Sequence, residues 1–286
     1  MRSPSPQLLR VAEVGDAPTI LVGTRDAVTA RMVLDAGFDG GWVSSLEISA
    51  ITGVQDCNLL SVDAVAAVVR AITLAVPLPL LVDADNCYGS VSASARTVRV
   101  LAAAGAAGMC IEDSAYPKQN SFTTGTHRNL VALNDFADCI NAAVAARPDP
   151  AFLVVGRTET LTVGLPLSEA LQRARTIASA GADLVLLHST DPTGAEARAV
   201  AAQWTGEVPL VIVPTAFPHL DTATLGKLGY SMVIYANQSL RAAIHATRVL
   251  LRALGETGSA ETDMVTMPEL LELMNRFDDG RDPRRR

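Results

Sequence analysis

Three carboxylates stand at the ends of two apolar runs of the chain. Asp83 and Asp85 end the run PLLVDAD at 79–85, and Glu112 lies in the run GMCIED at 108–113. If both runs are strands, Asp83 and Asp85 point to the same side of the pleat, and Glu112 reaches the same point from the neighbouring strand. Crowded carboxylates raise one another's pKa unless a cation neutralises them. All-oxygen ligation predicts Mg2+, with Mn2+ as the alternative; without a metal, the acids would share a proton or cap helices.

An arginine and a histidine lie in two further apolar runs. Arg157 belongs to the run FLVVGRTE, where a buried guanidinium needs a partner and offers a planar fork for a substrate carboxylate. Glu159 could be that partner in an internal salt bridge instead. His188 is expected to be neutral and orienting, although a lone histidine is as often a satisfied core residue. Asp113 faces away from Glu112 and is expected to be structural.

The elements that must position these residues alternate regularly between strand-like and helix-like segments. Nearly continuous apolar runs, typical of strands buried on both faces of a parallel sheet, occur at 19–23, 40–45, 79–85, 108–113, 152–159, 182–189, 208–215 and 231–237. Periodic, Ala-rich segments between them predict helices at 27–36, 62–74, 92–104, 133–146, 167–179, 193–204 and 238–254. Eight such units without a composition break predict an α/β fold, a (β/α)8 TIM barrel that residues 1–286 form as a single domain. An open doubly wound sheet is the alternative, but no GxGxxG or GxxxxGK[ST] turn supports nucleotide binding.

The active site of such a barrel forms at the carboxyl ends of its strands, where the polar residues of this chain gather. Ser44, Ser45 and Leu46 begin the loop after the second strand, and backbone N–H groups there can bind an anionic oxygen. Solvated caps are the alternative for any one of these polar residues. Their joint position at one rim favours a site.

The loop after the fourth strand is long and polar. It has the sequence SAYPKQNSFTTGTHR at 114–128, directly beyond Glu112. A loop of this kind over a metal site is a lid candidate. Lys118, Asn120 and Ser121 would bring one positive charge and several hydrogen-bond donors onto a bound phosphoryl group.

The composition narrows the class of function. The 286 residues carry a formal net charge of −7 and a pI of about 5.1, which argues against a nucleic-acid partner. No uncharged apolar run is long enough to span a bilayer, and the first ten residues lack the apolar core of a secretory signal. The four cysteines show no metal-ligand spacing and fit a reducing cytosol. We therefore expect a cytoplasmic protein that acts on a small molecule and binds neither nucleic acid nor membrane.

A C-terminal extension follows the eighth unit at 255–286. It contains the segment MPELLELMNRF at 267–277, which has helical periodicity. Because this segment lies outside the barrel repeat, it is expected to pack on a partner subunit.

Several segments together resemble phosphoenolpyruvate mutase, within the isocitrate lyase and phosphoenolpyruvate mutase superfamily. They run in the same order from about residue 19 to 277 and are WVSSLEISAITGVQDCN, DADNCYG, IEDSAYPKQNSF, ADLVLLHS and VPTAFP. The P-K-x-N-S element of the lid is the specific part, since D-x-D is common to the superfamily. The resemblance implies an isomerase that interconverts phosphoenolpyruvate and 3-phosphonopyruvate, which forms a phosphorus–carbon bond for phosphonate biosynthesis.

The same resemblance implies roles for individual residues. The metal would be bound directly by Asp83 and through water by Asp56, Asp85 and Glu112. The carboxylate and ketone oxygens of the substrate would be held by Ser44, the amides of Ser45 and Leu46, and Arg157. The phosphoryl group would be covered by Lys118, Asn120 and Ser121, with support from His188. The residues expected to act in catalysis are Asp56, Lys118, Asn120, Ser121, Arg157 and His188.

The family also buries a C-terminal helical segment against a neighbouring subunit. This implies a homodimer or homotetramer, with the extension at 255–286 exchanged between subunits as one arrangement.

Other activities of the superfamily stay open. Phosphonopyruvate hydrolase shares the barrel and the metal, but carries threonine at the lid position of Asn120, so that Asn120 favours the mutase. A carboxyphosphoenolpyruvate mutase would use almost the same site. Lyases of the 2-methylisocitrate type carry K-[KR]-C-G-H in this lid, where the present chain reads KQNSF and has no cysteine.

Three departures from the family pattern favour a non-catalytic paralogue that only binds a 2-oxoacid. The usual Thr-Gly after D-x-D is Asn86-Cys87, the usual Gly-Ser-Gly after the second-strand tryptophan is Val43-Ser44-Ser45, and the usual Lys after Glu-Asp is Ser114. The side chain of Ser45 could crowd the oxoacid, and Cys87 could narrow the metal pocket.

Overall fold

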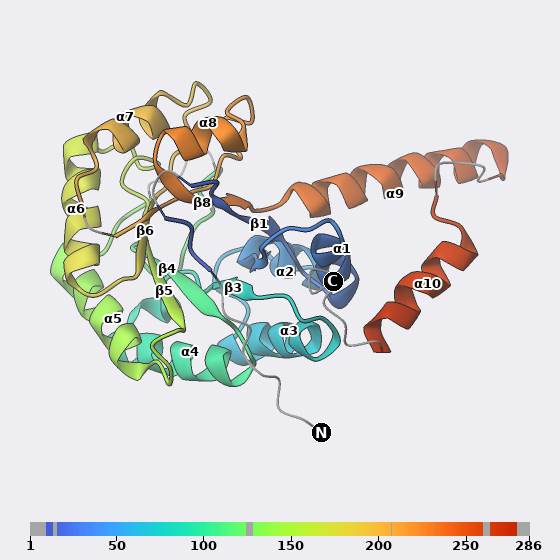
Figure 1. Ribbon diagram of the computed structural model, residues 1–286, viewed down its shortest axis with the longest axis horizontal. Helices are drawn as coiled ribbons and strands as arrows, with labels where there is room; N and C mark the ends of the chain where they lie inside the picture. Colours follow the sequence, from blue (N-terminus) through green and yellow to red (C-terminus); the bar gives the residue numbers. More distant parts are fainter. Residues whose placement is uncertain (1–9, 14–15, 124–127, 207, 260–263, 279–286) are drawn as a thin grey trace.

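Parallel strands form a closed barrel in the computed structural model, which describes residues 10–13, 16–123, 128–206, 208–259 and 264–278 (Figure 1). The strands are β1 (Thr19–Gly23), β2 (Gly40–Val43), β3 (Leu80–Asp83), β4 (Gly108–Glu112), β5 (Leu153–Thr158), β6 (Leu184–Leu187), β7 (Leu210–Ile212) and β8 (Tyr230–Tyr235). They pair in chain order, and β8 closes the sheet by pairing with β1. The predicted (β/α)8 barrel is therefore confirmed, and the open doubly wound sheet is excluded.

Helices surround the barrel and connect its strands. They are α1 (Ala27–Asp35), α2 (Ser45–Thr52), α3 (Val62–Ala75), α4 (Val91–Ala103), α5 (Leu133–Ala146), α6 (Leu167–Ser179), α7 (Ala195–Gln203), α8 (Thr222–Lys227), α9 (Gln238–Thr257) and α10 (Met267–Asp278). A short 3-10 turn, η1 (Cys87–Gly89), precedes α4. The sequence predicted all of these helices except α2 and α8. Among the described residues, no helix is long and apolar enough to cross a membrane.

Two layers of apolar side chains explain why the strands read as continuous apolar runs. One set fills the barrel interior and includes Leu21, Trp42, Val155 and Leu186. The alternate strand residues, such as Val82, point outward and pack against the inner faces of the helices. Because both faces of each strand are buried, polar residues are displaced to the strand ends.

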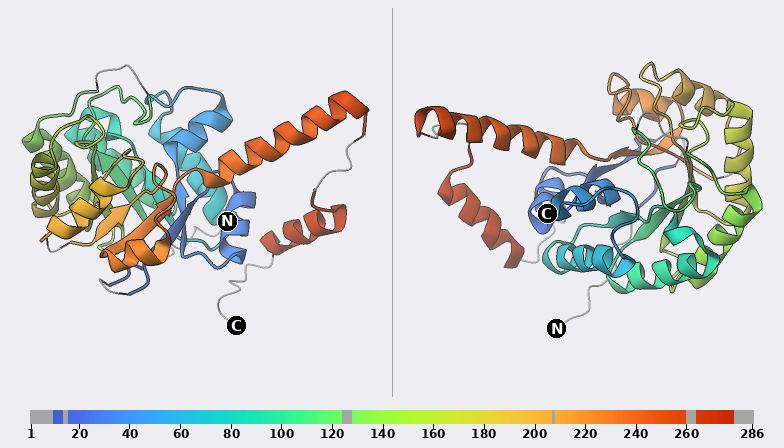
Figure 2. Two further views of the ribbon diagram at one scale, coloured as in Figure 1. Left: turned by 90° about the horizontal axis from the view of Figure 1, so that it is seen from above. Right: turned by 180° about the vertical axis from the view of Figure 1, so that it is seen from behind.

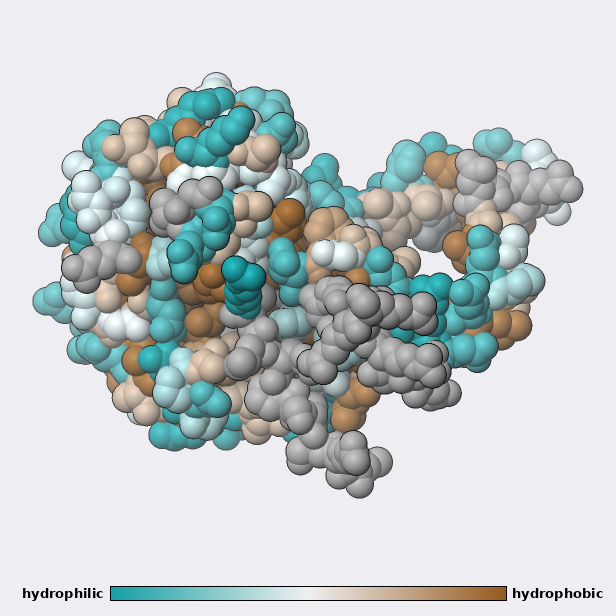
Figure 3. Space-filling view, in the orientation of Figure 1, coloured by the Kyte–Doolittle hydropathy of each residue, from teal (hydrophilic) through white to brown (hydrophobic). Residues whose placement is uncertain are grey.

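The last two helices are here called the arm: α9 extends away from the barrel, and α10 runs back toward it (Figures 1 and 2). None of the residues of α9 is buried, and its helix runs past residue 255, where the extension was expected to begin. The second helix, α10, touches the barrel at α1, where Arg276 Nη1 lies 2.9 Å from Asp35 Oδ2. Hydrophobic side chains show along the arm between polar ones (Figure 3).

Candidate active site

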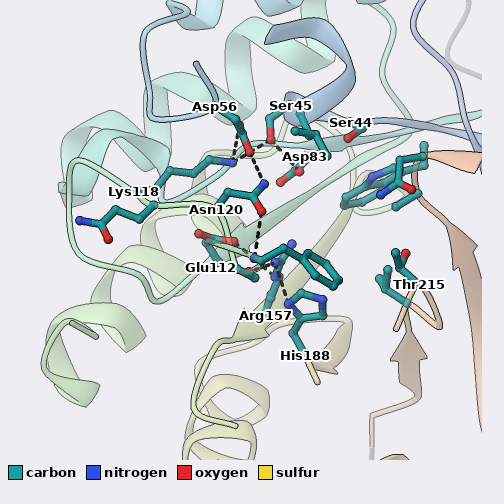
Figure 4. A pocket seen from close by; sticks show the side chains of 18 residues that line it. Ser44, Ser45, Asp56, Asp83, Glu112, Lys118, Asn120, Arg157, His188 and Thr215 are labelled. Atoms are coloured by element: carbon teal, nitrogen blue, oxygen red, sulfur yellow. Dashed lines mark hydrogen bonds and ion pairs between the residues drawn. The ribbon is translucent and has the colours of Figure 1, made fainter. Parts of the chain in front are cut away.

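A pocket opens at the carboxyl end of the strands (Figure 4). It is lined by Trp42, Ser44, Ser45, Leu46, Asp56, Asp83, Glu112, Lys118, Gln119, Asn120, Ser121, Phe122, Arg157, His188, Val213, Thr215, Ala236 and Asn237. Every predicted site residue except Asp85 belongs to this lining. The polar strand ends thus converge at one rim of the barrel.

An ammonium group lies among the carboxylates on one side of the pocket. The Ser45 hydroxyl donates to Asp83 Oδ2 at 2.8 Å and accepts from Lys118 Nζ at 2.9 Å. Lys118 Nζ also lies 2.8 Å from Asp56 Oδ1 and pairs with Asp85. Figure 4 shows Lys118 directed at Asp56 and Ser45, beside Asp83. Ser45 therefore links the acid at the end of β3 to the loop after β4.

The structure places Lys118 among the carboxylates and corrects one expectation for Asp85. That Lys118 covers a phosphoryl group stays a prediction; its side chain, in a residue only 5% exposed, pairs with the acidic cluster. The strand β3 ends at Asp83, so strand alternation does not reach Asp85, which has a left-handed φ of 50°. Its carboxylate accepts from Asn58 Nδ2 at 3.3 Å and lines an adjoining cavity, of which Asp83 is also part.

Ser44 and Ser45 stand at the start of a helix, whereas the sequence predicted a loop. Ser44 is the N-cap of α2, and its hydroxyl accepts from the backbone N–H of Glu47 at 3.4 Å. The first backbone N–H groups of a helix, here those of Ser45 and Leu46, have no partner within the helix. They favour a negatively charged group, so the predicted anion-binding role fits this element as well.

Glu112 lies between a hydroxyl and a guanidinium. Its Oε1 accepts from the Ser114 hydroxyl at 2.5 Å, and its Oε2 lies 3.3 Å from Arg157 Nε. Burial raises the pKa of Glu112 to about 7, although Arg157 opposes this shift. Ser114, one of the departures from the family pattern, thus supplies a neutral donor to this carboxylate.

Protein groups hold Arg157 along one edge of its guanidinium. Nε donates to Glu159 Oε1 at 2.5 Å, and Nη2 lies 3.2 Å from Ser121 Oγ and 2.9 Å from His188 Nδ1. The internal salt bridge that the sequence left open is therefore present. None of these contacts uses Nη1, which leaves that part of the fork for an anionic ligand.

His188 is 4% exposed, at the end of β6. Burial and the neighbouring Arg157 lower its pKa, although Glu159 opposes them. This shift favours the neutral imidazole that the sequence predicts.

The loop between β4 and α5 covers the pocket with neutral donors. Residues 124–127 of the predicted lid lie outside the described residues. Asn120 Nδ2 donates to Asp56 Oδ2 at 2.7 Å, and Ser121 Oγ donates to Glu159 Oε2 at 2.6 Å. The Phe122 ring meets His188 edge-on, with 6.4 Å between the ring centroids. Asn120 and Ser121 thus attach the loop to two separate carboxylates, in addition to the ion pairs of Lys118.

The charge and the donor atoms of the pocket fit a divalent cation. Burial, with Asp83 and Asp56 nearby, raises the pKa of Asp85 to about 6 in spite of Lys118. In the described parts of the chain, no three His, Cys, Asp or Glu side chains stand close enough together to hold a metal. Lys118 Nζ fills the space beside Asp56 and Asp85. The oxygen-only donors and their excess of negative charge are nevertheless what Mg2+ or Mn2+ binds.

The remaining departures from the family pattern do not narrow the pocket. Cys87 is fully buried, has a φ of 47° and packs in the core around the barrel, outside the pocket lining. The expectation that it narrows the metal pocket is therefore wrong. Asn86 Nδ2 donates to the carbonyl of Ser114 at 3.2 Å and fixes the turn after β3 to the loop after β4.

Asp113 has the structural role that the sequence predicted. Its Oδ2 accepts from Thr158 Oγ1 at 2.6 Å and lies 3.2 Å from Arg173 Nη1. Its Oδ1 accepts from the backbone N–H of Glu159 at 2.9 Å. It therefore fixes the end of β5 from outside the pocket.

Sequence reasoning missed several residues that shape the site. Asn58 Oδ1 accepts from the backbone N–H of Lys118 at 2.6 Å, and Phe122 and Trp42 line the pocket. Trp42 lies in the segment at 40–45, which predicted only a buried strand. No local pattern identifies Asn58, because its contact joins segments far apart in the chain.

A closed (β/α)8 barrel whose mouth carries an acidic cluster, an arginine and a covering loop defines a class of enzymes that act on small anionic substrates. The sequence model of the family described as "Phosphoenolpyruvate phosphomutase" matches residues 9–254. The chain belongs to this family.

Individual relatives carry different activities. The chain is 38% identical to a phosphonopyruvate hydrolase of Variovorax sp. (strain Pal2), over 93% of each chain. It is also similar to the crystal structure of a phosphoenolpyruvate phosphomutase from Streptomyces platensis subsp. rosaceus, with a TM-score of 0.88 and 34% identity over 92% of this chain and 93% of the other. A phosphonopyruvate hydrolase in complex with oxalate and Mg2+ gives a TM-score of 0.84 and 35% identity over 90% of each chain.

Proposed function

We propose that the protein is a phosphoenolpyruvate mutase, which interconverts phosphoenolpyruvate and 3-phosphonopyruvate. The reaction breaks the bond between phosphorus and the O2 oxygen and forms a bond between phosphorus and C3, so no water is consumed. The observation that carries the proposal is the neutral amide of Asn120, which covers the pocket and is bonded to Asp56. Asn120 stands at the lid position where the resemblance places threonine in hydrolases.

The occupied carboxylate of Asp56 supports a mutase over a hydrolase. A hydrolase needs a base that takes a proton from water. Lys118 Nζ lies 2.8 Å from Asp56 Oδ1, and Asn120 Nδ2 donates to Asp56 Oδ2 at 2.7 Å. Both oxygens are therefore engaged while the loop covers the pocket. The neutral side chains of Asn120 and Ser121 over the pocket suit a phosphoryl group that must not meet water.

The pyruvoyl part of the substrate has matching groups at the other side of the pocket. Arg157 Nη1 and the first N–H groups of α2 would hold its carboxylate and ketone oxygens. Asp83 and Glu112 would hold a Mg2+ ion, with Asp56 and Asp85 beside it. When bound, such an ion stabilises the negative charge of the enolate. The related hydrolase that binds oxalate and Mg2+ supports this assignment by similarity.

Phosphonopyruvate hydrolysis is the second candidate. The Variovorax hydrolase matches over 93% of both chains at 38% identity, so overall similarity does not separate the two activities. Phosphorus NMR of phosphonopyruvate incubated with the protein and Mg2+ separates them directly. We expect a phosphoenolpyruvate signal; inorganic phosphate would indicate the hydrolase, and an unchanged spectrum would indicate a paralogue that only binds.

Two substitutions test the assigned groups in the same assay. Asn120→Ala should lower phosphoryl transfer on the order of 10²-fold, the usual cost of losing one donor to the reacting group, with cation binding retained. Asp83→Ala should abolish metal-dependent turnover and leave the barrel folded by circular dichroism. Asn134→Ala, on the exposed face of α5, is the matched control. Full activity of Asn120→Ala would contradict the role of the loop.

A further inference from the structure

The carboxylate of Glu159 makes more contacts than a salt bridge with Arg157 alone. Glu159 is 1% exposed, and its two carboxylate oxygens bind different parts of the molecule. Oε1 accepts from Arg157 Nε at 2.5 Å and lies 2.9 Å from His188 Nδ1. Oε2 accepts from Ser121 Oγ at 2.6 Å and from Arg128 Nη1 at 3.2 Å. One oxygen thus binds residues of β5 and the β6 end. The other binds the loop after β4 and also accepts from Thr162 Oγ1 at 2.6 Å.

The surroundings of Glu159 favour its charged form although the side chain is buried. Burial alone would raise the pKa of its carboxyl, but Arg157 and the hydrogen bonds from His188 and Ser121 hold it well below the usual value. A buried, charged acceptor orders its donors more strongly than a neutral one. Its contacts therefore fix the positions of the groups that surround it.

His188 Nδ1 has two neighbours with opposite requirements. Glu159 Oε1 can accept a hydrogen bond from Nδ1 only when Nδ1 is protonated. Arg157 Nη2 can donate to Nδ1 only when Nδ1 is unprotonated. The charged carboxylate is the stronger partner, and Nη2 also has Ser121 Oγ at 3.2 Å. Glu159 therefore selects the Nδ1–H tautomer, and Nε2 is the unprotonated nitrogen.

We propose that Glu159 is a positioning residue, which couples the docking of the loop after β4 to the alignment of Arg157 and His188. Glu159 is not part of the pocket lining, so it acts through these groups. The inference rests on the proposed function, because it takes Arg157 and the loop as the parts that hold the substrate. It applies equally to a mutase and to a hydrolase.

The variant Glu159→Gln separates positioning from simple charge balance. Oxalate, a small planar dianion, serves as the probe together with Mg2+. If Glu159 only balanced charge, its removal would leave Arg157 more positive and would tighten oxalate binding. Because Glu159 positions Arg157, we expect the oxalate Kd by calorimetry to rise, on the order of tenfold. An unchanged or tighter Kd would overturn the proposal.

Two further readouts report the coupling without any turnover. Hydrogen exchange of the loop at 114–123 should become faster in Glu159→Gln, and the 15N shifts of His188 should lose the Nδ1–H signature. Ser121→Ala removes the contacts of this hydroxyl to Glu159 Oε2 and to Arg157 Nη2, but keeps the carboxylate of Glu159 beside His188, so it should loosen the loop and leave the tautomer unchanged. If Glu159→Gln does not fold, Ser121→Ala still tests the proposal: an unchanged loop exchange would overturn it.

Asp183→Asn is the matched control. Asp183 precedes β6, and both its oxygens pair with Arg147 Nη1, at 2.9 and 3.0 Å. Asp183 lies beside the same two strands, β5 and β6, as Glu159 and His188, but at the amino ends of the strands instead of the carboxyl ends. It should leave the oxalate Kd, the loop exchange and the His188 tautomer at their wild-type values. These binding results and the phosphorus NMR assay can fail independently, so the two proposals are distinguishable.

Discussion

The ammonium group of Lys118 neutralises charge that would otherwise oppose the assembly of the acidic cluster. Burial lowers the pKa of Lys118, but Asp85, Asp83, Glu112 and Asp56 together raise it well above the usual value. The side chain is therefore charged in the folded protein. A divalent cation bound at the same carboxylates would perform the same neutralisation.

Replacing this lysine should make folding depend on the cation. In Lys118→Met, the carboxylates of Asp56 and Asp85 lose the ammonium group that pairs with both, which costs about 3 kcal/mol of unfolding free energy when no divalent cation is present. Added Mg2+ should stabilise the variant more than it stabilises the wild type. Urea unfolding with and without Mg2+ measures both effects.

Lys227→Met is the control, because Lys227 is the other lysine of the chain and lies exposed on α8. It should respond to Mg2+ as the wild type does. If Mg2+ stabilised Lys118→Met and the wild type by the same amount, Lys118 would not be the group that neutralises these carboxylates when the cation is absent.

The residue types of the site were predictable, but their pairings were not. Carboxylates at strand ends follow from the barrel rule, so Asp83 and Glu112 were placed correctly in the pocket. Asp85 was not, because a left-handed turn follows β3 and strand periodicity stops there. The partner of Lys118 depends on contacts between distant segments, which no local pattern specifies.

Among the elements, α2 is joined to the start of α9 by a buried acid. Glu47 of α2 is fully buried, and its Oε1 accepts from Ser239 Oγ at 3.2 Å and from the backbone N–H of Leu240 at 3.3 Å. Its Oε2 has no partner among the described residues. Burial raises the pKa of Glu47 to about 7, and Arg25 only partly opposes this.

The contact of Glu47 with the start of α9 should contribute less to stability as the pH rises. The folded pKa of Glu47, about 7, exceeds the reference value of 4.5, so the folded state keeps its proton longer than the unfolded state. Its contribution to stability is present below pH 4.5 and is lost as the pH rises through 7. Glu47→Gln removes this titration, so the stability of the variant relative to the wild type should increase between pH 5 and 8, by roughly 2 to 3 kcal/mol.

Urea unfolding of both proteins at several pH values measures this difference. The comparison removes the contributions of other acids, since both proteins share them. A stability difference that stays constant with pH would mean that Glu47 is already ionised in the folded state near pH 5.

Long elements were predicted more accurately than short ones. The predicted helices at 133–146 and 167–179 match α5 and α6 to the residue, because each has a clear apolar face. The helices α2 and α8 were missed because they are short, with eight and six residues. In α2, Ser45, Glu47 and Ser49 are also buried, so the inward face does not read as apolar.

At the scale of the whole molecule, the arm carries apolar side chains that are exposed to solvent in the single chain. Ile244, Leu251 and Leu254 of α9 are 40%, 60% and 41% exposed. In α10, Leu271 and Met274 are 52% and 54% exposed. An amphipathic helix gains most of its stability from packing its apolar face, which α9 does not do within one chain. The arm therefore supports the prediction that the protein forms a homodimer or homotetramer.

Charges placed on this face should separate the subunits. Ile244 and Leu251 are seven residues apart and lie on one side of α9, so Ile244→Glu with Leu251→Glu would bury two unpaired carboxylates in an interface. Light scattering after size-exclusion chromatography should give the wild type a mass of two or four times the 30.0 kDa chain, and the double variant one chain mass. Leu165→Glu changes a residue that is 37% exposed, outside the arm, and should keep the wild-type mass. A wild type with the mass of one chain would show that the arm has no partner subunit, whereas an assembled double variant would place the interface elsewhere.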